Sequence, residues 1–297
     1  MIKLLLLVLI LSWGNVWCAS YQIGIYTDEP SHQKALGLVE YFKNTEPFRR
    51  LDINFNIFDI SSRKLNCKSE NGIDRLIVCD SKLVSAVAAK SGMDQAFVVT
   101  NNPKYGGSGG SVPVITTSAE TPYSMMIHEY LHTLGFGDEY AYSASEAEIY
   151  CKRSLFYINL AIIEPQPQGY SGGDAEARKI HSKDIPWYTV IQPTTWIASN
   201  RLGTPGNDTN RVGLFPAQTC RKKAKPMTLW RPGSHTNVME DLDQPLNELA
   251  PIVQATLASA GYTIKTEVGC EPTTEGQPLP PPILRNFKVN YPTYINY

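Results

Sequence analysis

The segment from His128 to Asp138 constrains the fold of this chain more than any other, because it reads H-E-x-x-H-x-x-G-x-x-D. Two histidines four residues apart lie one turn above each other on an α-helix, so both imidazole rings can reach one metal ion. Gly135, three residues further on, can adopt a positive φ and turn the chain sharply at the end of the helix. This turn is expected to bring Asp138 back toward the two rings.

The residue types in this motif suit zinc, which takes imidazole nitrogen and carboxylate oxygen and, in a catalytic site, leaves one position for water. We interpret His128, His132 and Asp138 as the three ligands. Glu129, beside the first histidine, is the expected general base that takes a proton from zinc-bound water. Spacing alone does not separate Asp138 from Glu139 as the third ligand. We favour Asp138, with Glu139 orienting a ligand or pairing with a buried charge. The alternative is a solvated helix end with two incidental histidines, which the rest of the motif argues against.

The composition is that of an ordinary globular protein. Of the 297 residues, 42% are hydrophobic and 19% are charged, which is ample material for a sizeable core. The formal net charge is −1, and the densest basic run, over 221–225, is only a modest cluster. Nucleic acid is therefore not an expected partner.

The N-terminus has the pattern of a secretory signal peptide. Lys3 precedes an unbroken aliphatic run from Leu4 to Leu11, and small residues follow it. The run is too short to span a bilayer and no later segment is apolar enough, so we expect no stable membrane insertion. We predict that residues 1–20 are removed and that the mature chain is secreted, to an extracellular or periplasmic space. Lipidation at Cys18 is the alternative, which the bulky Trp17 before it disfavours.

Removal of this segment leaves an odd number of cysteines, and secretion permits disulfides. Cys67 and Cys79 close a short local loop and are the first expected pair. Cys151 with Cys220 is the second. One cysteine, Cys270 under this pairing, would stay unpaired or bond to another chain.

Strand and helix patterns alternate ahead of the metal motif. Period-two and β-branched runs predict strands, and apolar residues at helical spacing predict helices. The expected order is a strand over 21–27, a helix over 31–43, strands over 52–60 and 76–79, a helix over 82–90 and a strand over 96–100. This alternation indicates an α/β fold with a mixed, twisted sheet in layers with helices.

A glycine-rich stretch, residues 101–110, separates these elements from the motif, and a strand is expected over 112–116. A plain surface loop is one interpretation. The other is that the strand over 112–116 forms the rim of a cleft and holds an extended peptide by main-chain hydrogen bonds, with Gly107 and Gly109 close to the substrate. The lack of a following Gly-Lys-Ser/Thr argues against phosphate binding.

Three more helices are predicted. Thr121 followed by proline is a helix start and predicts the metal-binding helix to about residue 134. A capping box that begins at Ser145 predicts a second helix through Cys151. Hydrophobic periodicity predicts a last helix over 245–260. The segment 165–210 is rich in Pro, Gly, Ser and Trp and is interpreted as irregular loops that make a loop-rich C-terminal subdomain beside the cleft.

The second half of the chain supplies further candidate residues. A methionine in a tight turn beneath the metal is typical of metzincins, and Met239 is the candidate, with an ordinary core methionine as the alternative. Arg231 or His235 could stabilise an oxyanion or contact substrate, and ligation of the metal by His235 is less favoured. His181 is interpreted as a structural histidine. Asn207 begins a glycosylation sequon.

A family resemblance is carried by Glu46-Pro47-Phe48, the stretch Tyr105-Gly106-Gly107-Ser108-Gly109, the metal motif with its Asp138-Glu139-Tyr140 ending, and Trp230-Arg231-Pro232 with Met239. With these residues the chain resembles the IgA-peptidase family of secreted zinc metallopeptidases over about residues 21–261. The resemblance implies a metzincin-like zincin fold and a zinc ion held by His128, His132 and Asp138, with Glu129 as base. It does not give the substrate. One departure, the basic and cysteine-containing region 216–225, puts substrate preference in doubt.

We therefore expect a signal peptide (1–20), a zinc metallopeptidase catalytic domain (21–265) and a proline-rich C-terminal tail (266–297). The expected function is hydrolysis of peptide bonds in a protein or peptide substrate by zinc-bound water, with Glu129 as the general base. The first alternative is a catalytically silent, zinc-containing binding protein of the same fold. The second is a metal-dependent hydrolase that acts on something other than peptides.

Overall fold

The structure of the protein is a computed structural model that describes residues 20–70, 73–152, 157–199, 201–203, 210–262, 265–266 and 269–270. Residues 1–19 of the predicted signal peptide, Cys18 among them, lie outside the described residues. So do the sequon at Asn207 and the part of the predicted tail from residue 271 onward.

A five-stranded mixed sheet forms the centre of the N-terminal half, with the strand order β2-β1-β5-β7-β6. Its strands are β1 (Tyr21–Thr27), β2 (Ile53–Asp59), β5 (Gln95–Thr100), β6 (Gly107–Ser108) and β7 (Val114–Thr116). Strands β2, β1, β5 and β7 run parallel to one another, whereas β6 runs antiparallel to β7. Together with the helices around it, this sheet confirms the prediction of an α/β fold.

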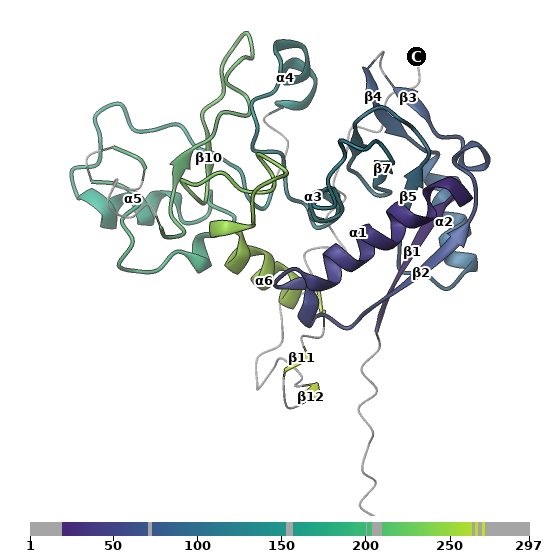
Figure 1. The fold of residues 1–297 in the computed structure, drawn as a ribbon. Coiled ribbons are helices and arrows are strands. Elements are labelled where there is room, and N and C mark those ends of the chain that lie inside the picture. The colour runs from purple at the N-terminus through teal and green to yellow at the C-terminus, as the bar shows by residue number, and fades with distance from the viewer. Residues whose placement is uncertain are drawn as a thin grey trace, which may run out of the picture.

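Helices and a hairpin cover the two faces of the sheet (Figure 1). Because side chains alternate along a strand, Ile23 and Ile25 of β1 enter one core cluster and Tyr26 enters another. The first cluster also holds residues of α1 (His32–Asn44) and α3 (Met125–Thr133), and the second holds residues of α2 (Ser81–Lys90). A hairpin of β3 (Lys68–Glu70) and β4 (Ile73–Val78) contacts β6 and β7 on the second side.

The edge of the sheet differs from the prediction for the strand over 112–116. That strand, β7, lies between β5 and β6 and is not the rim. The edge strand is β6, which lies inside the glycine-rich stretch itself. The sequence pattern hid this strand because two residues, Gly107 and Ser108, are too few to show an alternation.

Two predicted helix starts also differ. The metal-binding helix begins at Met125 after turns, not at Thr121, whose hydroxyl lies 3.0 Å from that of Thr116 instead of capping the helix. The second helix, α4 (Ala144–Tyr150), is capped by Ser143 with Glu146, two residues ahead of the predicted box. Both errors arise because hydroxyl residues cluster at these positions, so that residue type alone does not select the cap.

The C-terminal half contains more regular structure than predicted. The segment 165–210 is predicted to be irregular, but it contains α5 (Gly173–His181), a strongly polar, amphipathic helix whose buried residues are Ala177 and His181. A small sheet joins β8 (Ala161–Ile162), β10 (Leu229–Arg231) and β9 (Phe215–Pro216), and β11 (Lys265–Thr266) pairs with β12 (Gly269–Cys270). The predicted last helix is α6 (Ala250–Ser259), preceded by a 3₁₀ turn.

The two halves share one hydrophobic core, with α3 between them (Figure 1). Buried side chains of α3, such as Tyr130 and Leu131, belong to the same cluster as Trp187, Trp230 and Leu249 from the C-terminal half. The helix that carries both histidines is therefore held from both sides.

Two disulfides, Cys67–Cys79 and Cys151–Cys220, confirm the predicted pairings. Within the described part of the chain, no helix has the length and apolar character needed to cross a membrane.

Candidate metal centre

Helix α3 places the two histidines in a nearly enclosed environment. His128 is 6% exposed and His132 is half-buried, one turn further along the same face. The neighbouring apolar residues of the helix, Ile127 and Leu131, point into the core and fix the rotation of the helix. The imidazole rings are consequently directed at one point, with their planes 89° apart.

A glycine turn ends the helix as the sequence predicts. Gly135 has a φ of 91°, a conformation that side chains with a Cβ rarely adopt. The Gly135 N–H donates to the His132 carbonyl, and the Phe136 N–H donates to the Leu131 carbonyl, which closes the last turn. The chain then reverses and carries Asp138 back toward the histidines.

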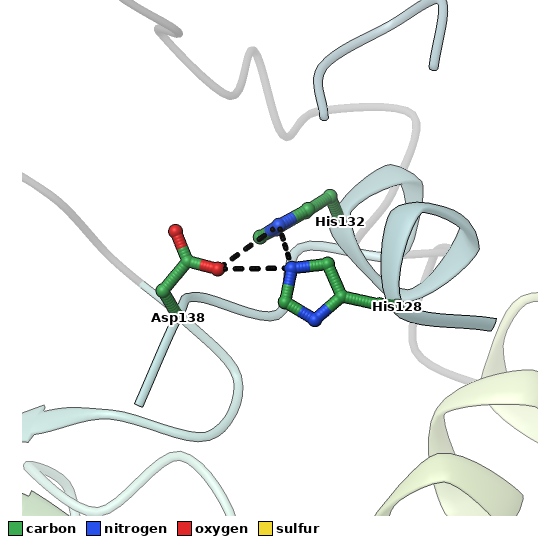
Figure 2. Close-up of side chains that lie close together, drawn as sticks. All are labelled: His128, His132 and Asp138. Carbon is green, nitrogen blue, oxygen red and sulfur yellow. Dashed lines mark hydrogen bonds and ion pairs between the residues drawn. The ribbon is translucent and has the colours of Figure 1, made fainter. Parts of the chain in front are cut away.

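His128, His132 and Asp138 meet at the end of this turn (Figure 2). The Nε2 atoms of the two histidines lie 3.2 Å apart, and Asp138 Oδ1 lies 3.2 Å from each of them. This is the set of residues that the sequence predicts as ligands. In the described part of the chain, no other group of His, Cys, Asp or Glu side chains meets the geometry of a metal site.

The hydrogen bonds on the far side of each ring show that the converging atoms are acceptors. His128 Nδ1 lies 2.8 Å from the Val238 carbonyl oxygen, and His132 Nδ1 lies 2.9 Å from that of Phe136. Because a carbonyl only accepts, each Nδ1 carries the hydrogen, and in the neutral ring Nε2 presents a lone pair. The buried Asp138 Oδ1 has no hydrogen-bond partner.

Three electron-pair donors that face one another fit a cation. Ligand atoms at about 2.0–2.2 Å from a tetrahedral zinc ion are about 3.4 Å apart, close to the observed separations of 3.2 Å. Two imidazoles and a carboxylate also match the donor types that zinc prefers. The residues present therefore fit a divalent zinc ion, although the same set can hold other transition metals.

The charges around this point favour a positive charge. Burial disfavours the charged form of His132, but the adjacent Asp138 carboxylate outweighs it and raises the pKa of His132 to about 9. Burial likewise opposes ionisation of Asp138, yet the two histidines hold the pKa of its carboxyl well below the usual value. The site therefore stabilises a cation at its centre.

Asp138 is oriented by neighbours that the sequence did not single out. Its second carboxylate oxygen, Oδ2, accepts a hydrogen bond of 2.8 Å from the Tyr142 hydroxyl. Its backbone carbonyl accepts from the Thr219 hydroxyl, and the Tyr142 N–H donates to the Thr219 carbonyl. These contacts hold the aspartate from a segment that lies far away in the sequence and direct Oδ1 at the histidines.

Glu139 lies behind the ligand loop and is fully buried. Its carboxylate accepts hydrogen bonds from the side-chain amides of Asn159 and Asn237 and lies 3.5 Å from Arg231 Nη1. Burial raises the pKa of Glu139 to about 7, against the lowering effect of these partners. The structure thus places Glu139 among buried polar partners and not among the converging donors, which supports the preference for Asp138.

The segment that contains Met239 supports the site through its backbone. Met239 is fully buried, its carbonyl accepts from the Glu139 N–H, and its own N–H donates to Asn237 Oδ1. The preceding carbonyl, that of Val238, accepts from His128. This segment therefore fixes one histidine ring and the ligand loop at the same time.

Glu129 and the two predicted glycines lie together at the edge of the sheet. Glu129 is 3% exposed, and its Oε2 atom has no hydrogen-bond partner. Burial raises the pKa of its carboxyl, and the charges of His128 and His132 oppose that rise.

A Cβ atom on Gly107 would lie 2.4 Å from Glu129 Oε1, and one on Gly109 would lie 2.5 Å from His132 Cδ2. Only glycine lets β6 approach the helix this closely.

A cleft opens from this centre. It has a volume of about 340 Å³, and its walls include His128, Glu129, Gly107 and Val238. One histidine, the candidate base and the edge strand thus face the same solvent-accessible space. The cleft is the place where a substrate would meet the site.

The remaining predicted residues are not brought into the site. The Nδ1–H of His235 donates to the Glu248 carboxylate, and His235 lies outside the converging group, so ligation by His235 has no support. Arg231 binds Glu240 and the Ser234 carbonyl and does not line the cleft. His181 is buried against Tyr170, as expected of a structural histidine.

Comparison with known proteins adds no assignment. No protein-family model matches the chain, and none of the curated proteins matches it. The site must therefore be interpreted from its own geometry.

Proposed function

We propose that the protein is a zinc-dependent peptidase. The observation that carries the proposal is the convergence of His128, His132 and Asp138 beside a buried glutamate, Glu129, that lines the same cleft. A metal site that only stabilises a fold is closed by a fourth protein ligand, whereas three ligands and an adjacent base are typical of hydrolytic sites.

The chain's own residues supply the acid–base chemistry. A zinc ion bound here would polarise a carbonyl group and make water more acidic. Glu129 takes the proton of the attacking water on its carboxylate and delivers it to the leaving amine. Burial keeps this carboxylate basic, and the absence of a hydrogen-bond partner on Oε2 leaves the atom available for that proton.

The sheet edge beside the cleft favours an extended chain as substrate. The edge strand β6 lines it through Gly107, and a sheet edge can pair with a peptide backbone through main-chain hydrogen bonds. We assign this role to β6 in place of the strand over 112–116, which lies inside the sheet.

The proposal includes a metzincin-like fold. What supports it is the order of parts: a helix with two histidines, a glycine turn at Gly135, a third ligand that follows it, and the Met239 segment behind the site. The proposal also includes secretion, because both disulfides require an oxidising compartment.

Cleavage of an unbiased peptide library by the full mature chain, loaded with zinc, tests the function. We expect cleavage by the wild type and none by Glu129→Ala, with equal zinc content in the two proteins by atomic absorption. If the wild type binds zinc but cleaves nothing, the peptidase proposal is overturned in favour of a zinc-containing binding protein. Cleavage of small esters alone would instead point to a non-peptide substrate.

A further inference from the structure

The cleft beside the metal centre is acidic. Besides Glu129, four carboxylates line it: Glu120, Glu240, Asp241 and Asp243. No lysine or arginine is among its lining residues. The chain as a whole has a formal net charge of only −1, so this concentration of negative charge is local to the cleft.

Most of this charge is not neutralised within the described part of the protein. Arg231 forms an ion pair with Glu240 and offsets that carboxylate. Asp241 accepts hydrogen bonds only from neutral donors, the Asp243 N–H and the Gln244 side chain. No ion pair among the described residues involves Glu120, Asp241 or Asp243. A negative potential therefore remains at the mouth of the cleft.

The deeper wall of the cleft points to an organic cation as the occupant. Glu129 lines the same cavity, its side chain is 97% buried, and its Oε2 atom has no hydrogen-bond partner. Tyr105 and Tyr140 also line the cavity, and aromatic rings stabilise ammonium and guanidinium groups through their faces. The apolar side chains of Met125 and Leu242 add surface for an aliphatic stem.

A second metal ion is a poorer occupant of this acidic wall. The side chains of the described residues that could hold a metal ion form one group, and it contains none of these four carboxylates. Carboxylates that line a cavity without converging on one point suit an elongated cation better than a compact ion that needs six or more oxygen ligands.

We propose that the cleft selects peptides that carry an ammonium or guanidinium group next to the scissile bond. The inference rests on the proposed peptidase function and names the class of substrate for that site. Two sources share this chemistry: the side chain of a lysine or arginine, and a free peptide amino terminus.

Binding to a protein that does not turn over tests the selection without relying on activity. The zinc-free wild-type protein, which keeps the Glu129 carboxylate, is titrated by calorimetry with an N-acetylated arginine peptide and with its citrulline counterpart, which has the same shape and no charge. We expect binding of the arginine peptide to be tighter by roughly tenfold or more, as for several ion pairs acting together. A third, non-acetylated peptide without basic side chains identifies the amino terminus as the source if it alone binds. Equal affinity for all three peptides overturns the proposal.

A charge-removal pair locates the effect. In the same zinc-free protein, Glu120→Gln with Asp243→Asn should lower the preference for the cationic peptide roughly three- to tenfold. The matched control, Glu29→Gln with Glu40→Gln, removes the same charge from exposed positions outside the cleft and should leave the preference unchanged. An equal loss in both pairs would show that only the overall charge matters and would contradict the proposal.

Salt provides a measurement that needs no variant. At about 1 M salt, charges are screened beyond about 3 Å, so the preference should largely disappear. A preference that persists at this salt concentration contradicts the electrostatic origin.

Cleavage assays distinguish a failure of the proposed selectivity from a failure of the proposed peptidase function. Cleavage of the arginine and citrulline peptides at equal rates contradicts the selectivity and supports the peptidase function. Selective binding without any cleavage contradicts the peptidase function and supports the cationic ligand.

Discussion

Asp138 presents its two carboxylate oxygens to different partners. Oδ1 faces the two Nε2 atoms, and Oδ2 accepts from the Tyr142 hydroxyl. Without the hydrogen bond from Tyr142, the Asp138 carboxylate would be free to rotate, and Oδ1 would no longer be held toward the two histidines. The arrangement is the usual one in which an outer partner orients a ligand and tunes its affinity.

We predict that Tyr142→Phe weakens zinc binding by roughly 10- to 100-fold, because it removes this hydrogen bond and leaves the ring in place. Competition with a chromophoric chelator measures the change. Tyr150→Phe is the matched control, since its ring packs against Tyr142 in the same cluster and the change keeps the Tyr142 hydroxyl that donates to Asp138. Unchanged zinc affinity in Tyr142→Phe would show that Asp138 needs no such orientation.

Glu139 offers a second prediction. Glu139→Gln replaces a carboxylate oxygen with an NH₂ group that faces the amide donor of Asn159 or Asn237, and it removes the charge near Arg231. We expect the free energy of unfolding to fall by about 1–3 kcal/mol, as for a buried amide donor left without its acceptor, because Arg231 keeps its ion pair with Glu240. Denaturant unfolding of the zinc-free protein measures it.

The control for this prediction is Glu240→Gln, which also touches Arg231 but lies nearer the surface and should cost less. A loss below about 1 kcal/mol in Glu139→Gln would mean that this buried network is not needed for the fold.

At this scale the sequence predicts the converging side chains and misses what orients them. The pattern from His128 to Asp138 is local, so helix geometry and one glycine are enough to bring the three residues together. Asn159, Thr219 and Asn237 reach the site only through the tertiary fold, and nothing in their local sequence marks them. His235 was a reasonable candidate by residue type, but its ring pairs with Glu248 instead.

Among the elements, the short strand β6 has the closest approach to the site. The backbone of β6 and of the residue after it passes so near α3 that Gly107 and Gly109 have no room for a side chain. The strand therefore limits the space around the Glu129 carboxylate, and it also forms part of the wall of the cleft.

We predict that Gly107→Ala lowers kcat about 100-fold or more while zinc content stays close to one per chain. The new Cβ would lie 2.4 Å from Glu129 Oε1 and must displace the base, and misplacement by about 1 Å costs about that factor. Ser111→Ala, an exposed position close by in the chain, is the control. Unaltered kcat in Gly107→Ala would argue against Glu129 as the base.

The elements also differ in how well their bounds can be predicted from sequence patterns. Long periodic segments such as β1, α1 and α2 lie within a residue or two of their predicted bounds, because many side chains report the same periodicity. Two-residue β6 offers no period, and α5 is polar apart from a narrow buried side with Ala177 and His181, so few large apolar residues mark it as a helix. The cap of α4 was misplaced by two residues because Ser143 and Ser145 are equivalent in type.

Across the whole molecule, the two halves meet on either side of α3, and the site depends on both (Figure 1). The N-terminal half supplies the sheet edge, and the C-terminal half supplies the backbone carbonyl for His128 and the hydroxyl of Thr219 for Asp138. Thr219 is next to Cys220, whose disulfide to Cys151 joins the two ends of a long intervening segment. The Cys151–Cys220 disulfide is therefore adjacent in sequence to Thr219, the residue whose hydroxyl donates to the Asp138 carbonyl.

This arrangement gives the last prediction. Replacing Cys151 and Cys220 together with serine should lower the free energy of unfolding by about 4 kcal/mol, because the bond closes a loop with a sequence separation of 69. It should also weaken zinc binding, since the segment that holds Asp138 through Thr219 loses its anchor. Replacing Cys67 and Cys79, with a separation of 12, should cost about 3 kcal/mol and leave zinc affinity unchanged, because that pair packs against the second core cluster, which contains none of the three ligands. Chemical unfolding and chelator competition on both double variants separate the two effects. Equal zinc affinity in the two variants would mean that the disulfide stabilises the fold without supporting the metal centre.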